Sequence, residues 1–509
     1  MHQTTDSLPP DGSISSGCSR LSSAQILLLV AILLAAASLR LVNIAWDNGT
    51  LPHPDERSTV AFYAPSVRWP ADLSDALDPR RSTLNPFWDV SSGNRRSYTY
   101  GHFPLYTLVL AAGAADGLAS LAGRLDLSGP LLQAMAEART MTGYAYLGRF
   151  LVALADIASV YLVFLIARRL YGTWAGLLAA ALSAFTVLQI QLAHFFAVDP
   201  ISTTFTLLAL YGAILMYERR MLGAALLTGL GIGLAVSSKY SALPIAAAAL
   251  VAVVLSVTRA DPAERDTARR LALRNLVIVG LVSFVVFAVT SPFVLLDFEN
   301  FWHAVVKEQG DMVSGVADFP FTRQYRGTLP YLYFIQQQIR WGMWWPLGLL
   351  AFAGLIWALI RAFLGRLGPG EWILLSWVVL YFGVTGLFLA KFMRYMVPVV
   401  PLFVIFGAGL VASLITVNQK VSKHLPHHRC GSASQQIGES ECQQTSPSTH
   451  HASRITHYVS RITFYVAYAV AFLAVVGAIF WSLAFVNGVY GTEHTWVTGS
   501  RWAYQNIPD

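Results

Sequence analysis

Long apolar runs recur along almost the whole chain, and each is long enough to cross a lipid bilayer. A transmembrane helix needs about 20 mainly apolar residues, and only helices or closed barrels satisfy their backbone groups inside lipid. The sequence lacks the short alternating segments of a barrel. It therefore predicts an all-α polytopic membrane protein with about eleven spans. They lie near residues 24–46, 143–169, 174–192, 200–218, 221–237, 242–257, 275–296, 345–363, 371–390, 395–417 and 462–487.

The composition excludes a soluble globular protein. Of the 509 residues, 55% are hydrophobic and 12% are charged, whereas soluble domains carry about 25% charged residues. The net charge of +7 lies mostly in short loops between the apolar runs. Such loops are basic on the cytoplasmic side of membrane proteins, so this charge does not indicate nucleic-acid binding.

The basic loops also orient the spans. They contain Arg168-Arg169, Arg219-Arg220, the run 259–274, Arg361 with Arg366, and Lys420 with Lys423. All of them are cytoplasmic only if the apolar segment 103–123 does not cross the membrane. We expect this segment to lie in the outer interface as a juxtamembrane helix. The N-terminus is then inside and the C-terminus outside, in a multi-pass protein of the plasma membrane.

This topology divides the chain into five parts. We expect a cytoplasmic tail at 1–23, a membrane core at 24–417 with outer loops 47–142 and 297–344, a disordered cytoplasmic loop at 418–461, the last span at 462–487, and the start of a truncated outer segment at 488–509. The first apolar run is long for a signal peptide, so we interpret it as a retained anchor. The disordered loop is predicted because it is rich in Ser, Gln and His and poor in large apolar residues.

Two adjacent carboxylates follow the first span, in the sequence His53-Pro54-Asp55-Glu56. Charge is sparse in this chain, and carboxylates beside a membrane are costly to desolvate unless they serve a site. Neighbouring side chains do not both point into one site. We therefore expect one of the two to act as a base and the other as a structural or metal-binding carboxylate. The alternative is that the pair merely ends a span in an outer loop.

Further charged residues emerge on the same predicted outer face. Asp199 precedes Pro200 at the start of a span, where it either caps the helix or serves as a second acid. Lys239, Lys391 and Arg394 lie outside against the positive-inside trend. They either bind a phosphate on a lipid carrier or snorkel at helix ends.

Aromatic and polar residues of the two outer loops complete the candidate set. His102 and Tyr106 belong to the sequence Tyr100-Gly101-His102-Phe103-Pro104-Leu105-Tyr106, and Arg323 and Tyr325 belong to the loop 297–344. We expect His102 to bind a phosphate or position an acceptor, and the other three to contact the sugar or the acceptor. A membrane-interface belt explains the aromatic residues equally well.

Six short motifs, taken in order, resemble those of GT-C glycosyltransferases. The resemblance is to the protein O-mannosyltransferase-like family 39, which includes the aminoarabinose lipid A transferases. The motifs are His53-Pro54-Asp55-Glu56, Gly101-His102-Phe103-Pro104-Leu105-Tyr106, Ala167-Arg168-Arg169-Leu170-Tyr171-Gly172, Phe196-Ala197-Val198-Asp199-Pro200, Ser238-Lys239-Tyr240-Ser241 and Arg394-Tyr395-Met396-Val397-Pro398.

The resemblance implies transfer of a hexosyl or pentosyl group, with inversion, from a polyprenyl-phosphate donor to a hydroxyl of a protein, lipid or glycan on the outer face. Asp55 would deprotonate the acceptor. The carrier phosphate would bind Lys239, Arg394, Tyr395 and His102. If a divalent cation such as Mg²⁺ or Mn²⁺ takes part, Asp199 and Glu56 are its expected ligands.

Two other classes of membrane protein stay open. A secondary transporter places ionisable residues near the middle of its spans, whereas here Asp156 is the main such residue. An oligosaccharide polymerase or ligase relies on a large outer loop late in the chain, whereas here the first outer loop is the longest. Both comparisons favour a glycosyltransferase with an interfacial site.

Overall fold

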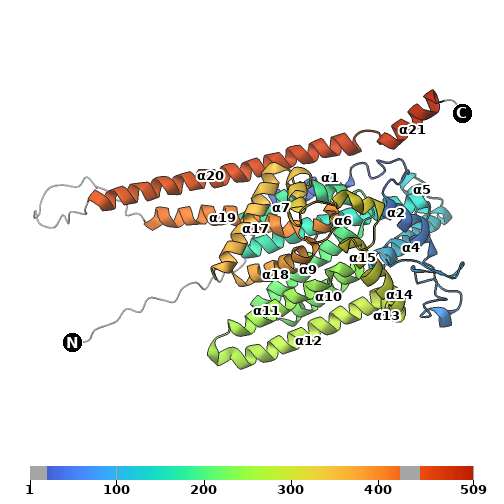
Figure 1. Ribbon diagram of the computed structural model, residues 1–509, viewed down its shortest axis with the longest axis horizontal. Coiled ribbons are helices and arrows are strands. Elements are labelled where there is room, and N and C mark those ends of the chain that lie inside the picture. Colours follow the sequence, from blue (N-terminus) through green and yellow to red (C-terminus); the bar gives the residue numbers. More distant parts are fainter. Residues whose placement is uncertain (1–19, 99, 425–446, 508–509) are drawn as a thin grey trace, which may run out of the picture.

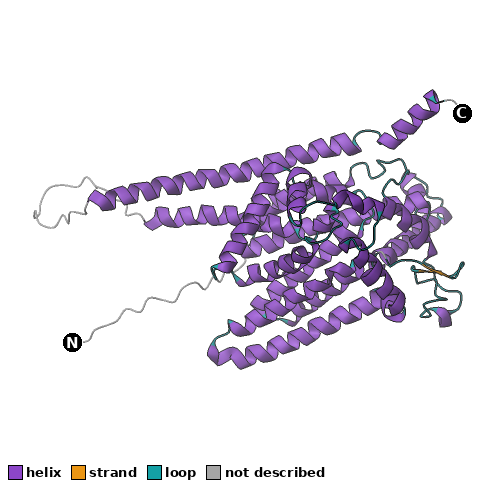
Figure 2. Cartoon of the chain, viewed as in Figure 1, coloured by secondary structure: helices purple, strands orange, loops and turns teal. Residues whose placement is uncertain are grey.

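The computed structural model describes residues 20–98, 100–424 and 447–507. These residues are almost all helical, and the short hairpin of β1 (Trp88–Asp89) and β2 (Asn94–Arg95) is their only paired strand structure (Figure 2). The predicted all-α membrane fold is confirmed.

The length of each apolar run and the residues that cap it determine where the helices begin and end. In α1, for example, Ser22 caps the first turn in a capping box with Gln25, and nineteen mostly apolar residues follow. The longer helices are α1 (Ser23–Leu41), α4 (His102–Arg124), α6 (Met141–Tyr171), α7 (Thr173–Ala184), α9 (Val198–Arg219), α10 (Leu222–Ser238), α11 (Ala246–Thr258), α12 (Arg265–Thr290), α17 (Trp345–Phe363), α18 (Pro369–Thr385), α19 (Val400–His424), α20 (Pro447–Phe485) and α21 (Thr495–Asn506). The short ones are α2 (Pro54–Ser58), α3 (Ala64–Ser66), α5 (Pro130–Ala136), α8 (Val187–Ala193), α13 (Pro292–Leu296), α14 (Phe298–Trp302), α15 (Gln309–Ser314) and α16 (Leu332–Gln337). Single turns join them, among them η3 (Tyr240–Ile245), η5 (His303–Glu308) and η8 (Met393–Met396).

Eight helical segments of the described chain are long and apolar enough to cross a membrane, and the bent pair α7–α8 makes nine. The helices α10, α18 and α19 add three shorter apolar candidates. Segment α4, which we expect to lie in the interface, passes the same test of length and hydropathy. The count of eleven spans and the interfacial place of α4 therefore stay predictions.

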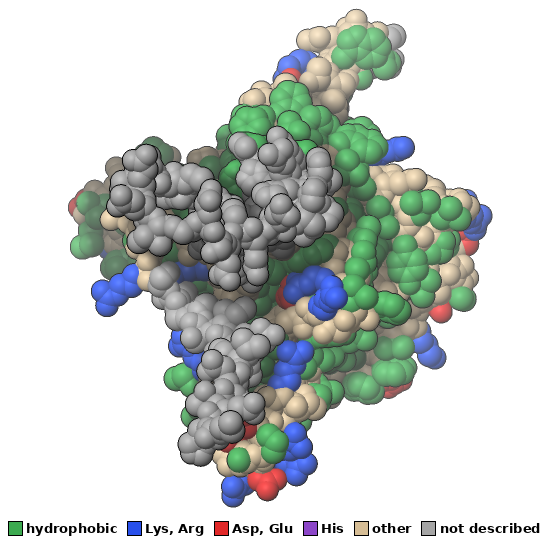
Figure 3. Space-filling model, turned by 90° about the vertical axis from the view of Figure 1, so that its left-hand side faces the viewer, with side chains coloured by type: hydrophobic (Ala, Val, Ile, Leu, Met, Phe, Trp, Pro, Cys, Tyr) green, Lys and Arg blue, Asp and Glu red, His purple; other side chains and the backbone are tan. Residues whose placement is uncertain are grey.

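The long helices run side by side, and α4 gathers with the short elements α2, α5, α14 and α15 at one end of this bundle (Figure 1). The opposite end, which faces the viewer in Figure 3, carries a group of Lys and Arg side chains. There the basic loop residues meet, since Arg169 pairs with Glu218, and Arg220 lies 3.9 Å from Glu264. The loops that we predict to be cytoplasmic thus lie at one end of the molecule.

A buried ion pair stabilises the bend of 55° between α7 and α8. Arg40 and Asp156 are fully buried and lie 2.5 Å apart. Arg40 also donates to the carbonyl oxygens of Ser183 (3.3 Å) and Ala184 (2.8 Å), at the end of α7 where the break lies. Asp156, the main charged residue inside a predicted span, is therefore paired with Arg40 and has a structural role.

The loop predicted to be disordered, 418–461, is only partly a loop. Helix α19 continues to His424 and α20 begins at Pro447, so both neighbouring spans extend into this segment. Adding a turn to an existing helix costs little compared with starting a new one, which explains how polar residues join these helices. The middle of the segment lies outside the described residues.

Candidate active site

The two adjacent carboxylates lie on a single short helix that turns them apart. Helix α2 starts just after α1, with Pro54 in its first turn and the ring of His53 accepting from the Glu56 amide at 3.4 Å. Successive side chains on a helix diverge by about 100°. Asp55 is therefore half-buried and faces η8, whereas Glu56 is fully buried and faces α6.

Asp55 forms an ion pair with Arg394 of η8 and a hydrogen bond with the side chain of Tyr100. Burial disfavours the charged carboxylate, but the Arg394 guanidinium and the two hydrogen bonds outweigh it, so the pKa of Asp55 lies below its usual value. Burial also lowers the pKa of His53. Asp55 is thus held ionised at neutral pH, next to a ring that is mostly uncharged.

The second acid forms a second ion pair. Asp199 is 3% exposed, and its Oδ1 lies 2.5 Å from the Nζ atom of Lys239, which in turn lies 5.1 Å from the ring centre of Tyr395. Ala197 is the N-cap of α9, so the predicted alternative of an Asp199 cap is wrong. Asp199 is also close enough to Arg394 to act on it electrostatically, so the two ion pairs are neighbours.

The four residues form a charge-balanced group, since two carboxylates face two cations. We name Asp55, Arg394, Asp199 and Lys239 the acid–base quartet. Four distant parts of the sequence supply it, from α2, α9, the end of α10 and η8. The fold therefore brings together four charged residues that the sequence placed on one face.

The expected metal ligands do not form a metal site. Glu56 is engaged with Arg149, and Asp199 is engaged with Lys239. No group of three or more His, Cys, Asp and Glu side chains among the described residues is placed to hold a metal ion. The residues present fit paired acids and bases better than a divalent cation, so we derive no step through a metal.

Glu56 anchors the helix that carries Asp55. Its two oxygens accept from Nε and Nη2 of Arg149, both at 2.8 Å, and Oε1 also accepts from the Phe196 amide at 2.8 Å. Arg149 is fully buried and binds Asp47 as well, at 2.7 and 3.0 Å. Because Phe196 lies three residues before Asp199, Glu56 ties the segments of both acids together. Its geometry indicates a positioning role.

The remaining candidates contact other groups than the four quartet residues, although Phe392 lies between Tyr325 and Arg394. His102 is fully buried, and its Nδ1 lies 3.3 Å from the Tyr240 hydroxyl, which explains it as a core residue better than as a phosphate ligand. Tyr106 donates to the carbonyl oxygen of Leu84 at 2.9 Å. Arg323 pairs with Asp318 on an exposed turn, and Tyr325 is buried against the ring of Phe392.

Sequence reasoning missed two residues of this region. Tyr100, which we read as part of an aromatic belt, contacts Asp55. Arg149 was not singled out, although a charged residue inside an apolar run is a signal that it has a buried partner.

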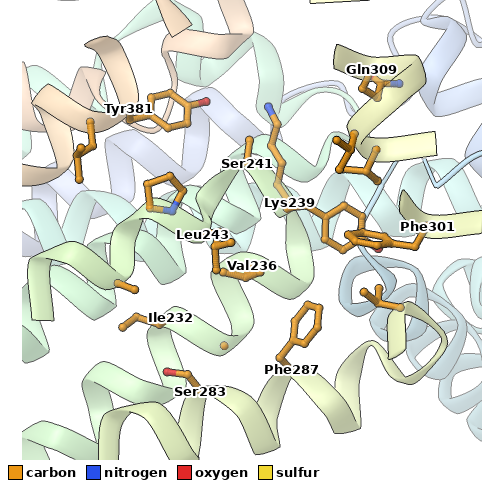
Figure 4. Close-up of a pocket in the computed structure, with 18 of the residues that line it drawn as sticks. Ile232, Val236, Lys239, Ser241, Leu243, Ser283, Phe287, Phe301, Gln309 and Tyr381 are labelled. Carbon is orange, nitrogen blue, oxygen red and sulfur yellow. The ribbon is translucent and has the colours of Figure 1, made fainter. Parts of the chain in front are cut away.

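An apolar cavity of about 1000 Å³ begins beside the quartet. Figure 4 shows Lys239, Ser241, Tyr381 and Gln309 toward one end of this cavity, and Ile232, Ser283 and Phe287 toward the other. Helices α10, α12 and α18 form part of the apolar wall, together with η3 and the segment 294–313. The cavity thus joins a polar end containing Lys239 to a long apolar space between helices.

Comparison with known structures identifies this architecture. ArnT from Cupriavidus metallidurans in the apo state is 16% identical and aligns over 92% of this chain and 77% of that chain, with a TM-score of 0.50. The chain has the GT-C fold. ArnT from the same organism bound to undecaprenyl phosphate is 15% identical, over 96% and 82% of the two chains, with a TM-score of 0.48. The oligosaccharyltransferase of Archaeoglobus fulgidus in complex with Zn and sulfate is 16% identical, over 95% and 56% of the chains, with a TM-score of 0.47.

Sequence comparison adds a partial match. Residues 145–295 match the family model of the dolichyl-phosphate-mannose-protein mannosyltransferases. The matched part of the GT-C fold contains Asp199 and Lys239, while Asp55 and Arg394 lie outside it. No curated protein sequence matches the chain.

Proposed function

We propose that this protein is a membrane glycosyltransferase that moves a sugar from a polyprenyl-phosphate donor to an acceptor hydroxyl. The observation that carries the proposal is the acid–base quartet at the polar end of the apolar cavity. A lipid-linked sugar has the matching chemistry, since it combines a long apolar chain, a phosphate and a reactive sugar carbon.

The apolar chain of the donor fits the space between α10, α12 and α18. Its phosphate then lies near Lys239, which lines the cavity, and near Arg394, which neighbours the lining residue Tyr395. ArnT, whose fold this chain shares, has been solved with undecaprenyl phosphate. The cavity and the cations together support a polyprenyl phosphate as the carrier.

Asp55 is the proposed base. It accepts the proton of the acceptor hydroxyl while the acceptor oxygen bonds to the anomeric carbon and the bond from that carbon to the phosphate oxygen breaks, with inversion. The polyprenyl phosphate leaves with the electron pair of the broken bond. A positioned base contributes about 10² to 10⁴ in rate, and oriented cations stabilise the charge on the leaving phosphate.

The ion pairs also suggest how donor binding activates Asp55. A phosphate that recruits Arg394 removes the interaction that holds the Asp55 pKa down. Burial then raises the basicity of this carboxylate at the moment when the acceptor must be deprotonated. Exchange of Arg394 from carboxylate to phosphate thus links donor binding to catalysis.

A further cation balances the phosphate. The quartet is neutral, so an added phosphate needs positive charge from elsewhere. Lys391 is 3% exposed, and the one hydrogen bond of its Nζ atom within the described chain goes to the carbonyl oxygen of Leu389 at 3.3 Å. Buried lysines are rarely unpaired. We assign Lys391, three residues before Arg394, to the leaving phosphate.

We place the reaction on the outer face of the membrane. Helix α2, which carries Asp55 of the quartet, and helix α14 lie at the end of the bundle opposite the basic loops (Figure 1). Basic loops face the cytoplasm in most membrane proteins, so the site faces outward.

The purified full-length protein in lipid nanodiscs tests this function. Incubation with a labelled polyprenyl-phosphate sugar and an envelope extract should release polyprenyl phosphate and label an extract component. Release that requires no protein, or an absence of transfer across hexose and pentose donors, contradicts the proposal.

A further inference from the structure

The helical segment α14–η5 separates two hollows of different character. Side chains on one of its sides line the apolar cavity, and those on the other side line a second, smaller cleft of about 230 Å³. The first set is Phe298, Phe301, Trp302, Val305 and Val306, and the second is Glu299, Asn300, Trp302, His303 and Lys307. Trp302 contributes to both, so one amphipathic segment forms the wall between them.

The smaller cleft presents three cations whose side chains donate no hydrogen bond within the described part of the chain. Arg80 of the first outer loop, Arg95 of β2 and Lys307 of η5 all line it. For two of them the nearest acid lies beyond hydrogen-bond range, with Asp297 at 3.8 Å from Arg80 and Glu308 at 3.7 Å from Arg95. An N–H···O hydrogen bond spans about 2.7–3.2 Å, so these contacts leave the donors free for a closer acceptor.

Part of the cleft is held in place before any ligand arrives. The Arg80 guanidinium lies 4.1 Å from the ring centre of Trp88, which fixes its direction. Asn300 is 6% exposed, and its amide donates to Asp297 at 3.2 Å. The acid Glu299 also lines the cleft. A fitting ligand therefore has an anionic group for the three cations and a hydroxyl group that donates to Glu299.

Exposed apolar residues on the same segment favour a ligand from the bilayer. Phe298 and Trp302 of this segment, and Leu295 of the neighbouring α13, line the apolar cavity and are still 54%, 48% and 45% exposed. Large apolar side chains at the edge of a transmembrane bundle lie in the lipid interface. A lipid beside them has its headgroup at the level of the cationic cleft.

We propose that this cleft is a second ligand site, for the phosphate-bearing headgroup of a membrane lipid. Arg80, Arg95 and Lys307 bind the phosphate, and Glu299 accepts from headgroup hydroxyls. The bound lipid fixes α14–η5 and thereby the wall of the apolar cavity. The site lies outside the acid–base quartet, so lipid binding does not depend on glycosyl transfer.

Native mass spectrometry of the detergent-solubilised full-length protein tests the proposal, with phosphatidylglycerol as the probe. The variant R80Q/K307Q should bind phosphatidylglycerol about tenfold more weakly, because two partly exposed ionic contacts are lost. The matched variant R124Q/R139Q removes two exposed arginines of the same outer loop and should bind as the wild type does. Melting temperatures of both variants confirm folding.

Two further arms distinguish the source of the phosphate. Phosphatidylcholine should bind more weakly than phosphatidylglycerol, and soluble glycerol phosphate should not compete at equal concentration. Equal loss of binding in both double variants, or no loss in either, would overturn the site. Effective competition by glycerol phosphate would overturn the assignment to a lipid.

Discussion

The carboxylate of Asp55 is ion-paired with the guanidinium of Arg394, although 339 positions separate them in the sequence. This contact opposes the effect of burial and keeps the pKa of Asp55 below 3.8. The pair therefore predicts how the reaction rate depends on pH.

Replacing Arg394 by Gln should move the acid limb of the rate profile to higher pH. A depressed pKa means that wild-type Asp55 stays ionised as the pH falls through the usual carboxyl range. In the variant, burial acts without its opposing cation and raises the pKa, so activity is lost earlier on acidification. The measurement is kcat/KM for the donor against pH, which reports the free enzyme, in which Arg394 still pairs with Asp55. An unchanged acid limb would show that the ionisation of Asp55 does not control the transfer reaction.

Loss of charge should mainly lower stability at Glu56 and mainly lower activity at Asp55. Removing one member of a buried ion pair costs about 3–5 kcal/mol, so E56Q should lower the melting temperature markedly. D55N breaks a partly exposed pair worth about 1 kcal/mol or less, and should lose activity with little loss of stability. Thermal unfolding in detergent, together with the transfer assay, checks this contrast. Equal melting temperatures for the two variants would rule out the anchoring role of Glu56.

The sequence was sufficient for the fold class, because long apolar runs have one solution in lipid. It also grouped Asp55, Asp199, Lys239 and Arg394, because the positive-inside trend assigns loops to a side without knowledge of packing. It could not show that Asp55 and Glu56 differ in burial and in their partners. That difference depends on the turn of α2 and on Arg149, a partner 93 residues away from Glu56. The burial of His102 was missed for a related reason, since only packing shows it.

The pairing of Asp199 with Lys239 predicts energetic coupling. Either K239M or D199N leaves a charge without its partner, so each should weaken donor binding and slow transfer. The double variant should lose less than the sum of the two, with a coupling of about 1–3 kcal/mol for a contact of 2.5 Å. A double-mutant cycle on kcat/KM measures it. Simple additivity would show that the two residues act independently.

Filling the apolar cavity should weaken donor binding without removing the catalytic groups. V236W places a large ring in the cavity wall, so the KM for a long-chain donor should rise by about tenfold with kcat retained. V254W, on an exposed position of α11 away from the cavity, is the matched control and should change neither constant. A rise in KM for both variants would point to a general effect on the membrane core.

The uncompensated cation gives a further test of charge balance. K391M should raise the KM for the donor and slow cleavage of the bond between the sugar and the carrier phosphate. The neutral quartet would then stabilise the charge on the phosphate alone. K391R should restore most of the activity, since it keeps the charge. Equal rates for K391M and the wild type would remove Lys391 from the phosphate site.

The most direct measurement of the central claim is single-turnover transfer from a labelled polyprenyl-phosphate sugar by the D55N protein in nanodiscs, with donor binding measured in parallel. We predict that D55N binds the donor and transfers at least about 10²-fold more slowly than the wild type. Transfer at the wild-type rate by a donor-bound D55N protein would contradict the account.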